Sequence, residues 1–116
     1  MEVTNLEQSK VLAEILPIES ADMYYWCGEY LRIVEHKAID KDYDIPCWSL
    51  GALLKVIPKH IKTVNTLRID IDEKGFSIWY DEVGCGVNTK LPDITMENPI
   101  NACVGIILKL HELNLL

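Results

Sequence analysis

The thiol of Cys85 has the clearest potential for chemistry, because it lies between two glycines in the motif Gly84-Cys85-Gly86. Glycine gives a permissive backbone, so the thiol is expected on an exposed loop. A cysteine close to a histidine such as His111 or His60 can act as a nucleophile. However, no thiol-enzyme signature surrounds Cys85, and no neighbouring charge favours its thiolate. A thiol-dependent or small-molecule-binding enzyme centred on Cys85 is therefore the alternative hypothesis for function.

Two groups of aspartates have spacings that invite comparison with a calcium-binding loop. The first covers residues 40–44, but Ile45 and Gly51 replace the turn glycine and the bidentate glutamate that an EF-hand requires. The second covers residues 70–81, where Lys74 would place a positive charge at a ligand position. We interpret these aspartates as solvated acids in turns, and we predict no metal site.

The cysteines and the N-terminus together predict the cellular compartment. The four cysteines lie far apart, without the paired spacing that zinc sites use. The N-terminus is acidic and polar and does not resemble a secretory signal. Free thiols in the reducing cytoplasm are the simplest interpretation, with no cofactor. The cysteines are Cys27, Cys47, Cys85 and Cys103.

Aromatic side chains are the remaining candidates for a binding site. In an alternating strand, Trp79 points away from the aliphatic side, and Arg68 on a paired strand can lie over its ring. Trp, Tyr and Arg contribute most of the binding energy at protein interfaces. We therefore predict an interaction patch formed by Trp79, Arg68 and a tyrosine such as Tyr25. Cys85, on a nearby loop, is predicted as a further contact. The competing interpretation places Trp79 in a second core layer beneath the N-terminal helix.

A β-hairpin over residues 67–81 has to position these side chains. Apolar and polar residues alternate with a period of two on both sides of Asp72-Glu73-Lys74-Gly75. Gly75 can take the positive φ that a tight hairpin loop requires. A shift of one residue would move every aliphatic side chain to the wrong face. The predicted register pairs Leu67 with Tyr80, Ile69 with Ile78, and Ile71 with Phe76.

The chain closes with a predicted helix that begins at Pro99. Asn98 is a good N-cap, and the missing N–H of Pro99 costs nothing at the first helical position. Gly105 is unfavourable in a helix interior by about 1 kcal/mol relative to Ala, and close approach to a strand would explain it. The apolar stripe consists of Ile100, Cys103, Val104, Ile107 and Leu110.

The first half of the chain shows two further segments. A helix is predicted with Thr4 as N-cap, Glu7 completing a capping box, and Pro17 as its end. Residues 22–35 are predicted to form a hairpin through a Gly28-Glu29 turn, and a single helix is the weaker alternative.

The middle of the chain completes the order of elements. A second helix is predicted between Ser49, as its cap, and Pro58. Residues 36–46 and 84–97 are predicted to be loops. The resulting class is α+β, with an antiparallel sheet of two hairpins and about four strands packed against about three helices.

Length and charge limit the classes of function. A chain of 116 residues is expected to form a single domain over residues 1–116. Its formal charge of −7 argues against a general nucleic-acid binder, which needs a concentrated basic surface. Its apolar segments are interrupted by charges, so no association with a membrane is expected.

Six segments of the chain form a recognisable set: residues 8–17 (QSKVLAEILP), 19–24 (ESADMY), 46–50 (PCWSL), 52–54 (ALL), 98–104 (NPINACV) and 110–112 (LHE). With these segments the chain resembles a family of small uncharacterised proteins from Bacteroides-type gut bacteria. The resemblance implies an association with prophages or other mobile elements. It implies no activity and no catalytic residue.

The sequence therefore favours a non-enzymatic protein-interaction module over an enzyme. The partner is expected to be another protein or a second copy of the chain, and the acidic surface favours a basic protein partner. The residues expected to take part are Arg68, Trp79, Tyr25 and Cys85.

Overall fold

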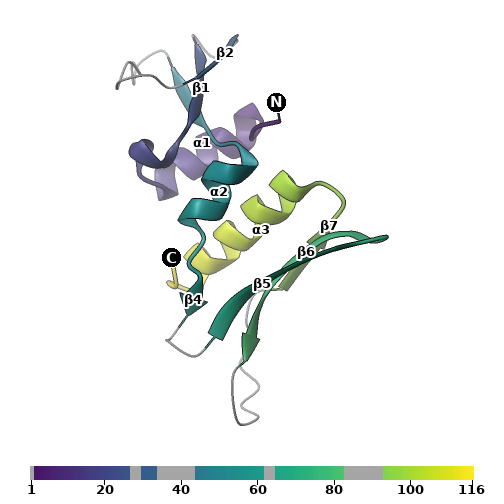
Figure 1. The fold of residues 1–116 in the computed structure, drawn as a ribbon. Coiled ribbons are helices and arrows are strands. Elements are labelled where there is room, and N and C mark those ends of the chain that lie inside the picture. The colour runs from purple at the N-terminus through teal and green to yellow at the C-terminus, as the bar shows by residue number, and fades with distance from the viewer. Residues whose placement is uncertain (1, 27–29, 34–43, 62–64, 83–92) are drawn as a thin grey trace. The chain divides into compact units, whose positions relative to one another are not determined.

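The predicted α+β class is confirmed, since helices pack on antiparallel sheets (Figure 1). The described residues divide into two compact units, residues 1–56 and residues 57–116, and each is described by itself. The expectation of one domain over residues 1–116 stays a prediction. The computed structural model describes residues 2–26, 30–33, 44–61, 65–82 and 93–116.

The first unit contains a three-stranded sheet beside α1. Its strand order is β2-β1-β3, and all pairs are antiparallel. Residues 23–26 and 30–33 pair as strands, so the hairpin interpretation is right and the helix alternative is wrong. The predicted Gly28-Glu29 turn lies outside the described residues. The elements are α1 (Leu6–Ile15), a short 3-10 helix η1 (Ile18–Ser20), β1 (Met23–Trp26), β2 (Tyr30–Ile33), β3 (Ile45–Cys47) and α2 (Leu50–Val56).

The start of α1 corrects the predicted cap by one residue. Asn5 is the N-cap: its side chain accepts the Gln8 backbone N–H at 2.8 Å, and Gln8 Oε1 accepts the Asn5 N–H at 3.0 Å. Thr4 is buried instead, and its Oγ1 accepts the backbone N–H of Trp48 at 3.1 Å. Asn5 and Gln8 therefore form the capping box in place of Thr4 and Glu7, while the Thr4 hydroxyl binds a residue distant in sequence.

Polar contacts around Trp48 and α2 complete the first unit. Trp48 is fully buried, and its Nε1–H donates to Ser20 Oγ at 2.9 Å. Ser49 caps α2 as predicted, since its Oγ accepts the Ala52 N–H at 3.3 Å. The carboxylate of Asp22 in turn accepts both the backbone N–H and the hydroxyl of Ser49. These bonds satisfy polar groups that would otherwise be costly to bury.

The second unit is a four-stranded antiparallel sheet with α3 across one face (Figure 1). Its strand order is β4-β5-β6-β7, and α3 packs against β6 and β7. The elements are β4 (His60–Ile61), β5 (Asn65–Asp72), β6 (Gly75–Glu82), β7 (Asp93–Met96) and α3 (Pro99–Glu112).

The β5–β6 hairpin has the predicted register in every pair. Gly75 has a φ of 123°, which matches the expected role of glycine in the turn. The inner face of the sheet, which is the face toward α3, carries the buried side chains of Phe76, Ile78 and Tyr80. The Tyr80 hydroxyl donates to the Pro58 carbonyl oxygen at 2.5 Å, and burial raises its pKa to about 12.

The aliphatic side chains of β5 do not follow those of β6 into the core. Ile69 is 42% exposed and Ile71 is 74% exposed, although both lie on the inner face. The reason is the position of α3, which packs against β6 and β7. The predicted packing of the sheet against helices therefore does not extend to the end of β5.

Helix α3 begins as predicted. Asn98 Oδ1 accepts the backbone N–H groups of Ile100 at 2.8 Å and Asn101 at 3.1 Å, and Pro99 stands at the first helical position. A Cβ on Gly105 would lie 3.5 Å from Ile94 Cγ2 of β7. This is an ordinary van der Waals distance, so a strand is close, as expected, but a methyl group still fits.

Three short strands were not predicted. β3 and β7 occupy the ends of segments predicted to be loops, and β4 follows the second helix. Each has only two to four residues and forms by pairing with a longer strand. Strands this short show no clear periodicity, so pairing with another strand decides them.

Gly105→Ala should stabilise the protein by about 0.5–1 kcal/mol, because Ala has the higher helix propensity and the new methyl group would lie at an ordinary van der Waals distance, 3.5 Å, from Ile94 Cγ2. The free energy of unfolding in urea, measured on the full chain, tests this expectation. Gly75→Ala is the matched control and should destabilise the protein by about 1–3 kcal/mol. There φ is positive, and the new Cβ would lie 2.5 Å from the Met96 carbonyl oxygen. A loss of stability in Gly105→Ala would contradict the packing described for α3.

Candidate interaction surface

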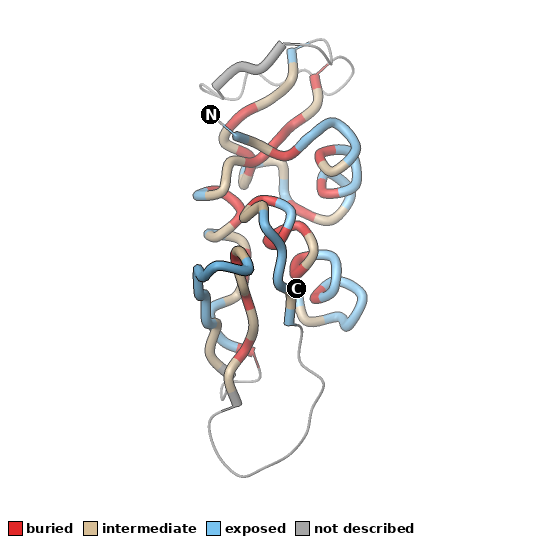
Figure 2. The backbone as a smooth tube through the Cα atoms, turned by 90° about the vertical axis from the view of Figure 1, so that its right-hand side faces the viewer, coloured by how far each residue is buried: buried red, intermediate tan, exposed pale blue. Residues whose placement is uncertain are grey.

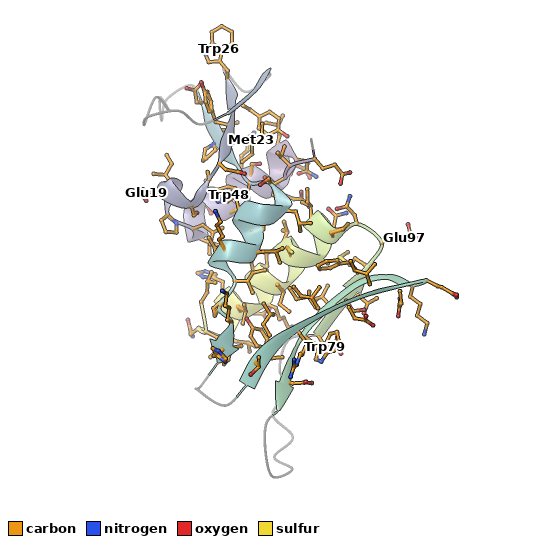
Figure 3. All side chains as sticks on the ribbon, viewed as in Figure 1. Glu19, Met23, Trp26, Trp48, Trp79 and Glu97 are labelled. Carbon is orange, nitrogen blue, oxygen red and sulfur yellow. The ribbon has the colours of Figure 1, made fainter. Side chains whose placement is uncertain are left out.

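Three side chains of the hairpin gather on the outer face of the sheet, the face opposite the buried residues of β6. Arg68 of β5 lies directly opposite Trp79 of β6, as the register predicts. Asp81 stands two residues after Trp79 and therefore points to the same side of the strand. Figure 3 shows Trp79 on the sheet. We call Arg68, Trp79 and Asp81 the outer triad.

The carboxylate of Asp81 connects the other two members of the outer triad. Its Oδ2 accepts from Arg68 Nε at 2.9 Å, and its Oδ1 accepts from Trp79 Nε1 at 3.1 Å. The side chains of Arg68 and Asp81 are 55% and 48% exposed, while Trp79 is half-buried. One carboxylate thus holds the indole and the guanidinium together on the outer face of the sheet.

The electrostatics of the triad follow from these contacts. The pKa of Asp81 lies below its ordinary value of 3.8, first because the Trp79 indole N–H donates to the carboxylate and next because Arg68 does so. A group with a lowered pKa stabilises the folded state above its ordinary pKa. That contribution is lost as the pH falls through the folded-state pKa. Because the carboxylate is exposed, solvent keeps the effect small.

Asp81 is the member of the triad that sequence reasoning missed. It was considered only as an acid in a possible calcium loop. The signal in the sequence was the spacing of two residues between Trp79 and Asp81, because alternate residues of a strand share a face.

Asp72, another member of the acidic group of residues 70–81, accepts the Lys74 N–H in the hairpin turn at 2.8 Å. In the described parts of the chain, no three His, Cys, Asp or Glu side chains converge as metal ligands would.

Next to the triad, the sheet has an edge that is only partly paired. β4 pairs with Asn65 and Thr66 of β5 and does not extend along the rest of the strand. Beyond this point, residues 68–72 pair on one side only within the described residues. We call residues 68–72 the β5 edge. All of its side chains are exposed, and the exposed stretch continues through the turn to Lys74 (pale blue in Figure 2).

Tyr25 belongs to the other sheet. It lies on β1 in the first unit, where its hydroxyl donates to the Thr4 carbonyl oxygen at 2.8 Å. Its pKa is raised above 10.0, chiefly by burial and also by Cys47. Tyr25 therefore has a structural contact with the N-terminal segment, and the predicted grouping with Arg68 and Trp79 does not occur within one sheet.

The predicted contact at Cys85 lies outside the described residues, and so does Cys27. Cys47 and Cys103 are fully buried free thiols. Burial raises the pKa of Cys47 to about 12, with a further contribution from Asp22, and that of Cys103 to about 11. Thiols with such pKa values remain protonated near neutrality, so these two cysteines are poor nucleophiles.

The first unit also has two open pockets of about 330 and 430 Å³. The smaller one contains the Ser49–Asp22 pair, in which the hydroxyl donates to the carboxylate. Among the residues that the structure describes, no histidine lines either pocket.

Comparison with known proteins adds no relative. No protein-family model matches the chain, and neither a curated protein nor a solved structure matches it. The resemblance to the Bacteroides-type family therefore stays a prediction from the sequence. Among the described helices, none is both long and apolar enough to cross a bilayer.

Trp79→Phe should raise the pKa of Asp81 toward 3.8, because the substitution removes the indole N–H that donates to the carboxylate. An NMR titration of the carboxyl carbon of Asp81 measures this shift. Trp26→Phe is the control, since it alters a tryptophan of the other unit and should leave the titration unchanged. An unaltered titration in Trp79→Phe would show that the indole does not bind Asp81.

Proposed function

We propose that the chain is a non-enzymatic protein-interaction module that binds a partner through the outer triad. The observation that supports the proposal most is that Asp81 holds Trp79 and Arg68 together on an exposed sheet face. Tryptophan and arginine are the residues most enriched at energetic hot spots of interfaces. Their combination at a surface is a reason to expect binding rather than only folding.

The contacts of the triad also reduce the entropic cost of binding. A free arginine side chain loses rotamer freedom when a partner immobilises it, at a cost of about 0.5–1.5 kcal/mol. Arg68 and Trp79 are already oriented by one carboxylate. Asp81 therefore acts as the residue that preorganises the surface, and the aromatic and cationic groups provide the contacts.

The location and the biological setting are part of the same proposal. Free buried thiols at Cys47 and Cys103 are consistent with a reducing compartment such as the cytoplasm. A formal charge of −7 favours a basic protein partner through electrostatic steering. The association with prophages or mobile elements rests on the sequence resemblance alone.

Trp79→Ala and Arg68→Ala should each weaken capture of a protein partner by about tenfold or more, because both remove hot-spot contacts. Affinity capture from extract of the native cell, with each variant immobilised at equal density, measures the loss. Thermal unfolding should change little, since Trp79 is only half-buried and an exposed ion pair contributes little stability.

Trp26→Ala is the matched control, because it removes an exposed tryptophan from the first unit. It should retain the captured partner. Equal capture by wild type, Trp79→Ala and Arg68→Ala would contradict the proposed function. A large loss of stability in Trp79→Ala would instead place this residue in the core.

A further inference from the structure

The β5 edge exposes one side of its backbone, because none of the described strands pairs with that side. Figure 1 shows β4 beside only the start of β5, while β5 continues toward the hairpin turn. Residues 68–72 pair with β6 on one side and have no paired strand on the other among the described residues. Unpaired edges of this kind are templates for pairing with another chain.

The direction of the backbone groups along this edge follows from one hydrogen bond. The backbone N–H of Leu67 donates to the Lys59 carbonyl oxygen at 2.8 Å, so it points away from β6. Successive residues of a strand direct their polar groups to opposite sides. The N–H and C=O of Ile69 and Ile71 therefore point outward as well, and those of Arg68 and Asp70 point to β6.

The side chains of the edge specify what kind of strand fits. On the inner face, Ile69 and Ile71 are exposed aliphatic residues. On the outer face, Asp70 and Asp72 are exposed carboxylates. A strand that pairs with the β5 edge would place its side chains opposite those of residues 68–72, alternately on the inner and the outer face of the sheet. Aliphatic residues would meet the isoleucines, and basic residues would meet the aspartates.

We infer that the β5 edge is a docking site for an extended segment of another protein in which aliphatic and basic residues alternate. The segment would extend the sheet by one strand, with backbone hydrogen bonds to Ile69 and Ile71. This inference rests on the proposed function and names the chemistry of the partner. The outer triad borders the same strand, so one partner can reach both surfaces.

A second copy of the chain fits this edge less well. A two-fold antiparallel pairing within residues 68–72 places Asp70 opposite Asp70 of the other copy. A pairing centred on Ile69 would need the position beside Leu67, which Lys59 already occupies. Each copy also carries a formal charge of −7.

The test uses the full chain and a short dye-labelled synthetic peptide in which Val and Lys alternate, with binding measured by fluorescence anisotropy at about 0.15 M ionic strength. The first comparison peptide replaces every Lys by Glu. The second has the same composition as the Val/Lys peptide, with the lysines in one block. The alternating Val/Lys peptide should bind about tenfold or more tightly than either, and it should perturb the NMR amide signals of Ile69 and Ile71.

Two variants of the protein make the result specific to the edge. Ile71→Pro removes an outward N–H that pairs with no strand among the described residues, so it should weaken peptide binding about tenfold or more, while Ile71→Val should not. Changing Asp70→Lys together with Asp72→Lys should reverse the preference toward the Val/Glu peptide. If Ile71→Pro is unfolded by circular dichroism, the charge reversal decides the question.

Three results would overturn the inference. The first is equal binding of the alternating and blocked peptides, or no binding of either. The second is binding that neither Ile71→Pro nor the charge reversal changes. The third is a dimer in light scattering that Ile71→Pro dissociates, which would place a second copy on the edge. If any of these results is obtained, the affinity capture decides whether the proposed function holds. The proposed function is retained if capture of the partner still depends on Trp79 and Arg68, and it is rejected if capture depends on neither residue.

Discussion

The antiparallel pairing of β5 with β6 is the constraint on which both interaction surfaces depend. Eight consecutive pairs, from Asn65 with Glu82 to Asp72 with Gly75, fix the face on which every side chain of the hairpin lies. Because side chains alternate, this one register puts Phe76 and Ile78 into the core and Trp79 onto the opposite face. A different register would exchange core and surface together.

The aliphatic side chains of the two hairpin strands differ in burial because α3 packs against β6 and β7. On β6 the aliphatic face is buried, whereas at the end of β5 the same face remains exposed. The sheet thus has an apolar strip at the edge where its backbone is also unpaired within the described residues. The outer face of the same hairpin carries an ordered carboxylate, guanidinium and indole. The pairing of β5 with β6 therefore determines both which side chains form the core and which are exposed at the surface.

Sequence reasoning succeeded where a local pattern and a special residue agreed, as at Gly75 in the hairpin and Asn98 before α3. It failed where a distant partner decided the outcome. Thr4 did not cap α1 because its hydroxyl binds Trp48, forty-four residues away. The position of Arg68 opposite Trp79 could be predicted from the register. The β5 edge could not, because strand order depends on where α3 and β4 pack, and no local period encodes that arrangement.

Amide hydrogen exchange of the native full chain, followed residue by residue by NMR, tests the pairing most directly. The pairing predicts slow exchange at Arg68 and Asp70, whose N–H groups bind β6. It predicts rapid exchange at Ile69 and Ile71, whose N–H groups face outward. Protection at the two isoleucines with rapid exchange at Arg68 and Asp70 would mean a register displaced by one residue, and the described core and surfaces would then both be wrong.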